Sequence, residues 1–328
     1  MKKRLENLDW IRGFAVLWVV IHHISLNYGY IKFGQCSEGV NAFTLLSFYM
    51  VPFYIVSGYF LNVKKHLQQF VCDKAKKLLI PYMTFTFFGL LIFEMFSLLK
   101  QGTVSIPNIG NFMSTGALVS NTPCWFFISL FFVNIIYYFI AKKKKWQKHA
   151  IIIACFILAF LTNGKAQYLG YGNILLGLVY FHIGTLFKEY ESVILQKRVL
   201  FFALAIYVSI SIVNPQRLSF VLNLQTCGNY ILNIFFSVSA MIICWKLALL
   251  WKHNGFITRN ICFVGKNSLV LFAYHRPVLN YIIQPALNRF CPDLGYISFL
   301  LIAFVLIIIL YSILNWCGKK YFPALLGM

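Results

Sequence analysis

The 328-residue sequence is 60% hydrophobic and 18% aromatic, and only 11% of its residues are charged. A soluble globular domain carries about 25% charged residues, so the composition excludes that class and predicts a helical membrane protein. The net charge of +21 is better explained by basic loops that hold one face in the cytoplasm than by nucleic-acid binding, and we expect no nucleic-acid partner. The nine cysteines have no metal-ligand spacing, so we expect no metal.

Apolar runs long enough to cross the lipid bilayer recur along the chain. A transmembrane helix needs about 20 residues. On this basis we predict ten spans, centred near residues 8–28, 40–62, 78–99, 124–141, 149–163, 169–187, 199–213, 228–250, 268–285 and 296–316. If the N-terminus lies inside, the inner segments hold 21 lysines and arginines and the outer segments hold 5. The sequence therefore predicts an all-α polytopic membrane protein with both termini in the cytoplasm.

No segment between the predicted spans is long enough to fold as a separate domain. We therefore expect residues 1–328 to form a single transmembrane domain, with no fused extramembrane domain.

The first predicted span, "LDWIRGFAVLWVVIHHIS" (residues 8–25), carries ionisable residues that are costly inside a membrane and usually serve a function there. Arg12 and His23 are eleven residues apart, close to three helical turns, so both project from one face about 16 Å apart along the axis. Asp9 can pair with Arg12 or orient it. Taken singly, Arg12 could extend to lipid headgroups and His23 could be a structural hydrogen-bonding group. Their shared face favours a polar pathway.

Several further segments follow in order. They are "VPFYIVSGYFL" (51–61, with Ser57), "DKAKKLLIPY" (73–82, with Lys74 and Lys77), "PCWFFISLFF" (123–132, with Trp125) and "GKNSLVLFAYH" (265–275, with His275). Together with the Arg-x10-His pattern of the first span, they resemble the membrane-bound acyltransferase-3 family. Members of this family are bacterial integral membrane enzymes that acylate cell-surface glycans.

The resemblance implies an O-acetyltransferase or related acyltransferase in the bacterial cytoplasmic (inner) membrane. It would transfer an acyl group, commonly acetyl, from cytoplasmic acetyl-CoA or another acyl-CoA to a cell-surface or lipid-linked glycan. His23 would be the catalytic histidine, and Arg12, Lys74 and Lys77 would contact the coenzyme. Lysines in place of the family's arginines at 74 and 77 keep the charge but lose bidentate geometry.

The residues leave parts of this chemistry open. A neutral histidine suits a general base that deprotonates the acceptor hydroxyl, but His23 could instead attack first and form an acyl-imidazole. The oxyanion donor could come from any of Ser57, Asn41, Tyr59 and Trp125.

Two neighbouring residues form a second polar pair within a predicted span. His275 could line the donor channel or make a structural hydrogen bond, and Arg276 is its neighbour in the chain. Pro277, which follows them, frees a backbone carbonyl that needs a partner.

A proton-coupled transporter or flippase is the main alternative, because buried Arg and His residues also serve carriers. The chain has no evident repeated halves, and a carrier would not need the ordered acyltransferase-like segments. The enzyme is therefore the favoured hypothesis.

Overall fold

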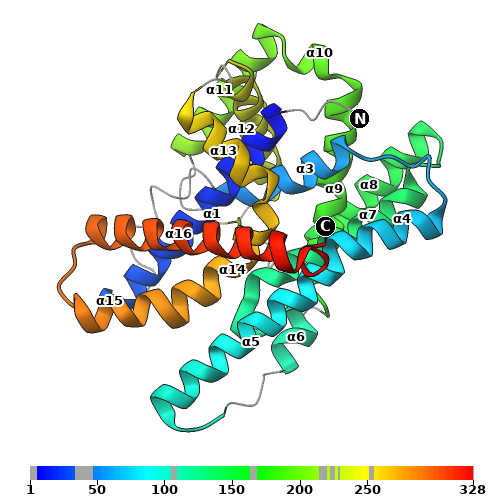
Figure 1. Ribbon diagram of the computed structural model, residues 1–328. Helices are drawn as coiled ribbons and strands as arrows, with labels where there is room; N and C mark the ends of the chain where they lie inside the picture. Colours follow the sequence, from blue (N-terminus) through cyan, green and yellow to red (C-terminus); the bar gives the residue numbers. More distant parts are fainter. Residues whose placement is uncertain are drawn as a thin grey trace.

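The computed structural model describes residues 6–33, 47–104, 109–162, 168–213, 220–221, 226–227, 230–250 and 255–327. These residues form a bundle of helices (Figure 1). The longer helices are α1 (Glu6–Phe33), α5 (Ile80–Gln101), α7 (Trp125–Ile140), α8 (Lys145–Leu161), α9 (Tyr171–Glu189), α11 (Lys197–Val213), α12 (Tyr230–Leu250), α13 (Phe256–Lys266), α14 (Ser268–Val278) and α16 (Tyr296–Tyr321).

Shorter elements connect them. They are η1 (Ser47–Met50), α3 (Val51–Tyr59), α4 (Leu67–Lys74), the π-helical η2 (Ala75–Leu79), α6 (Ile109–Thr115), η3 (Val119–Cys124), α10 (Glu191–Ile194), the π-helical η5 (Leu279–Ile283), α15 (Gln284–Phe290) and η6 (Pro323–Leu326). Strands β1 (Phe220–Val221) and β2 (Thr226–Cys227) form an antiparallel pair.

Most predicted spans coincide with a helix, and the second span is described only in part. Only residues 47–62 of the predicted span 40–62 are described, and they form the single turn η1 and the nine-residue α3. Pro52 has no N–H group and fits only the first turn of a helix, which explains why α3 begins at Val51. At nine residues α3 is too short to cross the bilayer by itself.

Four helical stretches among the described residues are long and apolar enough to cross a membrane. They are Leu67–Lys100, Ile109–Ile140, Ile231–Leu250 and Tyr296–Tyr321. The 28-residue α1 is also long enough, but its arginine and two adjacent histidines make it more polar than these four. The structure is therefore that of a helical membrane protein.

Glycine residues allow α1 to cross α13 with the two backbones in contact. A Cβ atom on Gly13 would lie 2.0 Å from the Ile261 carbonyl oxygen, and one on Gly265 would lie 1.7 Å from the Asp9 carbonyl oxygen. Small residues at a helix crossing permit this close packing in membrane proteins. The crossing holds the Asp9–Gly13 turn of α1, which includes Arg12, against α13.

The pair α3 and α9 crosses in the same way. A Cβ atom on Gly58 would lie 2.0 Å from the Phe181 carbonyl oxygen, and one on Gly184 would lie 2.0 Å from the Ile55 carbonyl oxygen. Each helix therefore presents a glycine to the backbone of the other, and the short α3 is held firmly on α9.

Candidate active site

The centre of the candidate site is a pair of histidines from α1 and α14. The rings of His23 and His275 have centroids 5.2 Å apart and planes inclined by 32°. His275 has no exposed surface, whereas His23 is only half-buried. Of the two rings, only that of His23 has exposed surface.

Hydrogen bonds to the backbone fix the tautomer of His275. Its Nδ1 lies 2.8 Å from the Phe272 carbonyl oxygen and 3.2 Å from the Leu271 carbonyl oxygen. Carbonyl oxygens only accept hydrogen bonds, so Nδ1 carries the hydrogen and Nε2 of the neutral ring is an acceptor. Among the described residues Nε2 has no hydrogen-bond partner. His275 thus presents an unused acceptor in the buried space beside His23.

Arg276 brings a positive charge to the same region. Its guanidinium lies close enough to His22 and His23 to interact with both electrostatically, and also with Tyr49. The rings of His22 and Tyr49 have centroids 5.2 Å apart. His22 therefore faces a tyrosine of η1, while its neighbour His23 faces α14.

Asn121 of η3 holds α14 in place at this site. Pro277 has no N–H group, so the carbonyl of Ala273, four residues earlier, lacks its usual partner within the helix. The Asn121 Nδ2 atom donates to this carbonyl oxygen at 2.9 Å and to the Phe85 carbonyl oxygen at 2.8 Å. The freed carbonyl predicted from Arg276–Pro277 therefore has a partner, which comes from another helix.

A cationic cluster forms near the N-terminal end of α1. The Asp9 Oδ1 and Arg12 Nη1 atoms are 4.0 Å apart, which confirms the predicted pairing. The Arg12 guanidinium lies over the Phe60 ring, 5.6 Å from its centroid. Lys74 interacts electrostatically with Arg12 and with Lys77. The fold thus gathers Arg12, Lys74 and Lys77, the three basic residues for which the sequence predicts a coenzyme contact.

The Lys77 part of this cluster sits in the π-helical turn η2. Single π-helical turns inside α-helices are frequent at functional sites, because they re-aim side chains. Lys74 is half-buried and lies 5.3 Å from the Phe70 ring centroid, whereas Lys77 is exposed. The two lysines therefore differ in how far they reach into the bundle.

Three of the four candidate oxyanion donors lie among the described residues. Tyr59 donates its hydroxyl hydrogen to Glu191 Oε2 at 2.9 Å, and so is engaged with the first residue of α10. Trp125 is buried at the start of α7 and packs edge-to-face on Phe126. Ser57 is half-buried on α3, and Asn41 lies outside the described residues.

Sequence reasoning missed Asn121 and the phenylalanine rings that pack against His275. Phe272 contacts His275 with ring centroids 6.0 Å apart, and Phe126 contacts Phe272 at 5.3 Å. The only signal for Asn121 in the sequence was Pro277, which leaves the Ala273 carbonyl without its usual helical donor. This shows that a donor is needed but not which residue supplies it.

Residues 5–316 match a family model, Acyl_transf_3, described as an acyltransferase domain. The chain belongs to the acyltransferase-3 family. Neither a comparison with curated proteins nor one with solved structures produced a match. Since the match covers nearly the whole chain, the site described above belongs to a membrane acyltransferase.

Proposed function

We propose that this membrane acyltransferase moves an acyl group, acetyl in the simplest case, from cytoplasmic acyl-CoA to a hydroxyl of a cell-surface or lipid-linked glycan. The observation that carries the proposal is the arrangement along α1. Arg12 belongs to a cationic cluster at one end, and the accessible His23 meets the buried His275 about 16 Å further along the axis.

The cationic cluster suits the phosphates of coenzyme A. Lysine and arginine bind phosphate through charge-assisted hydrogen bonds, and Arg12, Lys74 and Lys77 are grouped for this. The pantetheine arm is long enough to run from such a cluster toward the middle of the bilayer. The thioester would then reach His23 while the nucleotide stays at the membrane surface.

At the thioester, His23 would act as a general base. It removes the proton of the acceptor hydroxyl as that oxygen attacks the acyl carbon, and the tetrahedral intermediate collapses when the C–S bond breaks. The departing CoA thiolate takes the proton back from His23. In the alternative order His23 attacks the thioester itself and the acceptor takes the acyl group from the imidazole.

The neighbours of His23 supply positioning and charge in this scheme. The Nε2 atom of His275 would accept a hydrogen bond from the ring of His23 and so select its tautomer. The guanidinium of Arg276 interacts electrostatically with His23, and it would stabilise the oxyanion of the intermediate. His275 is thus a positioning residue in this proposal, in place of the donor-channel contact predicted from the sequence.

The membrane arrangement forms part of the proposal. Ten spans, both termini in the cytoplasm and a location in the bacterial cytoplasmic membrane would put the cationic cluster on the side that holds acyl-CoA. Single cysteines at Lys64 and at Lys100 in a cysteine-free variant would test this with a membrane-impermeant thiol reagent added to intact cells. Labelling at position 100 alone supports the arrangement, and labelling at position 64 alone reverses it.

The decisive experiment titrates acetyl-CoA against the full-length protein in nanodiscs. A ligand present at 100 times its dissociation constant should stabilise the native state by about 2.7 kcal/mol. We expect this in the wild type, a weaker response in Arg12→Ala and Lys74→Gln, and normal binding without thioester loss in His23→Ala. Lys143→Gln is the matched control, because Lys143 is an exposed lysine outside the cluster.

The outcomes of this titration separate the donor assignment from the catalytic assignment of His23. If neither acetyl-CoA nor longer acyl-CoAs stabilise the wild type, the donor assignment fails. If acyl-CoA binds and is consumed equally in His23→Ala, the catalytic assignment fails instead. If no acyl-CoA stabilises the wild type, the next experiment is a transport assay, which tests the alternative of a membrane carrier.

A further inference from the structure

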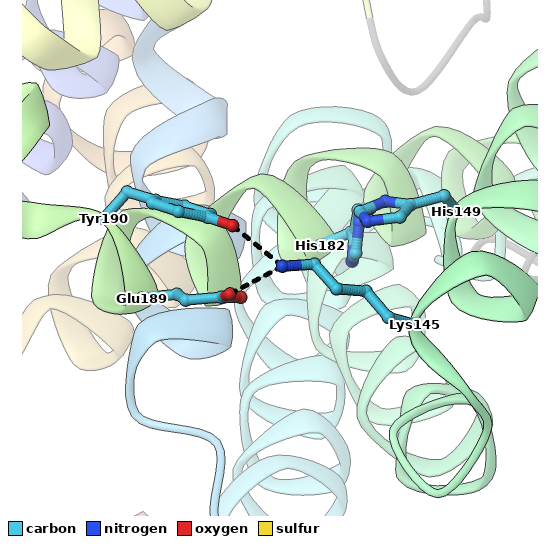
Figure 2. Close-up of polar contacts among 5 residues, drawn as sticks. All are labelled: Lys145, His149, His182, Glu189 and Tyr190. Atoms are coloured by element: carbon cyan, nitrogen blue, oxygen red, sulfur yellow. Dashed lines mark hydrogen bonds and ion pairs between the residues drawn. The ribbon is translucent and has the colours of Figure 1, made fainter.

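A second polar cluster lies where α7 ends, α8 begins and α9 ends (Figure 2). The Tyr137 hydroxyl and His182 Nδ1 are 2.5 Å apart, and His182 Nε2 and His149 Nδ1 are 3.0 Å apart. Lys145 Nζ donates to Glu189 Oε1 at 2.8 Å and to the Tyr190 hydroxyl at 2.8 Å. The cluster therefore consists of a hydrogen-bonded Tyr–His–His chain and a neighbouring salt bridge.

A cavity of about 450 Å³ opens between these side chains. Its lining includes Tyr137, His149, His182, Lys145, Lys148 and Lys188. Small-molecule sites commonly measure about 300–1,000 Å³, so the cavity has the size of a ligand site.

The cavity carries an excess of positive charge. The Lys145–Glu189 pair is neutral as a unit, and its hydrogen bond lowers the pKa of the Glu189 carboxyl and raises that of the Lys145 ammonium. The pair therefore stays ionised at neutral pH. Lys148 and Lys188 each add one positive charge, and neither has a carboxylate partner among the described residues. Two uncompensated cations facing one cavity match a doubly charged anion.

The histidine chain can aim a hydrogen-bond donor at such an anion. His182 is buried, and its Nδ1 can accept the hydrogen of the Tyr137 hydroxyl. In that state His182 Nε2 donates to His149 Nδ1, and the hydrogen of His149 is on Nε2. This Nε2–H group has no partner among the described residues. The alternative is that these lysines only contact lipid headgroups. Such lysines would not require a hydrogen-bonded Tyr–His–His chain beside them.

This cavity is distinct from the cationic cluster around Arg12. Tyr137 lines the cavity, whereas the next residue, Tyr138, packs on the Phe70 ring over which Lys74 lies. Successive residues of a helix point about 100° apart, so the two sets of cations lie on different faces of α7.

We propose that this cavity is a second ligand site, which binds the phosphate group of a phosphate monoester between Lys148, Lys188 and His149. A phosphate monoester carries a charge of about −1.5 to −2 at neutral pH, which matches the two uncompensated lysines. The phosphate can belong to a soluble metabolite or to the headgroup of phosphatidic acid, because the positive-inside count predicts that this end of the bundle faces the cytoplasm.

The test uses the full-length protein in nanodiscs and two kinds of probe. The soluble probes are AMP and inorganic phosphate, with adenosine as the uncharged control. The lipid probe is phosphatidic acid added to phosphatidylcholine discs. Binding is followed by the thermal unfolding midpoint and by titration, for the wild type and for the double variant Lys148→Gln/Lys188→Gln.

Two further double variants make the result specific. Lys143→Gln/Lys197→Gln removes the same charge from exposed positions outside the cavity. Arg12→Gln/Lys77→Gln removes charge from the cationic cluster instead. We expect the cavity variant to weaken binding at least about tenfold, because charge-assisted hydrogen bonds to two lysines are lost. The variant of the exposed lysines should bind as the wild type does, and Arg12→Gln/Lys77→Gln should keep the part of the binding that depends on Lys148 and Lys188.

Each outcome decides the proposal. A cavity-dependent response to AMP or phosphate identifies a soluble ligand, and one confined to phosphatidic acid identifies a lipid headgroup. The proposal is overturned if no probe stabilises the wild type or if the cavity variant responds normally. It is also overturned if only Arg12→Gln/Lys77→Gln loses the response, since the phosphate would then bind at the donor site.

Discussion

Replacing Asn121 by alanine should destabilise the protein, because the Ala273 carbonyl would lose its hydrogen-bond donor. Pro277 has already removed the usual helical donor to this carbonyl. Asn121 is fully buried and donates to the carbonyl oxygens of Phe85 and Ala273. The two hydrogen bonds differ in how much they contribute to stability. Phe85 lies inside α5, where the Gly89 N–H group is its regular helical partner, whereas Pro277 removes the regular helical partner of the Ala273 carbonyl.

The magnitude follows from this difference. An interhelical hydrogen bond inside a membrane protein contributes on average about 0.6 kcal/mol. A buried carbonyl that loses its only partner costs about 1–3 kcal/mol. The free energy of unfolding of Asn121→Ala should therefore fall by about 1.5–3.5 kcal/mol.

A double-mutant cycle with Pro277→Ala tests the cause. Alanine at 277 restores an N–H group that can bond to the Ala273 carbonyl, so Asn121→Ala should cost only about 0.6 kcal/mol in that background. The coupling energy would be about 1–3 kcal/mol. The assay is reversible unfolding in mixed micelles, followed by tryptophan fluorescence.

Asn134→Ala provides the matched control for this cycle. Asn134 is also buried, but its Nδ2 atom donates to the Leu130 carbonyl oxygen of its own helix at 2.7 Å. It should show no coupling to Pro277→Ala. If Asn121→Ala costs the same with and without Pro277, the stranded carbonyl is not the reason that Asn121 matters.

Two further predictions concern the close helix crossing and the exposed salt bridge. Gly58→Ala should lower the unfolding midpoint, with an overpacking cost of about 1–3 kcal/mol, because the new Cβ would lie 2.0 Å from the Phe181 carbonyl oxygen. Gly295→Ala is the control: its Cβ would meet open space, so the midpoint should not change. For the Lys145–Glu189 pair, the pKa of Glu189 is lowered in the folded protein, so its contribution is present above the ordinary value of 4.5 and is lost as the pH falls through the lowered pKa. Unfolding midpoints measured against pH should show this loss in the wild type, and a Glu189→Gln protein that shows the same acid dependence would contradict the assignment.

The apolar runs of the sequence were enough to place most of the helices. In a bilayer every backbone polar group must be satisfied within the segment, so a long apolar run has to form a helix. The same local logic put Arg12 and His23 on one face of α1 and indicated that the proline after Arg276 would leave a carbonyl in need of a donor. The family resemblance was also carried by short segments read in order, and the match over residues 5–316 confirms it.

Only the tertiary structure decided which of these elements meet. His23 lies against His275, Asn121 supplies the donor that Pro277 requires, and Tyr137, His182 and His149 form one chain from three helices. It also placed α3, which belongs to the second predicted span, on α9 through paired glycines. Helix periodicity specifies the direction of a side chain relative to its own axis, whereas these contacts depend on how the axes cross. That crossing is set by small residues and buried polar groups whose partners lie far away in the chain.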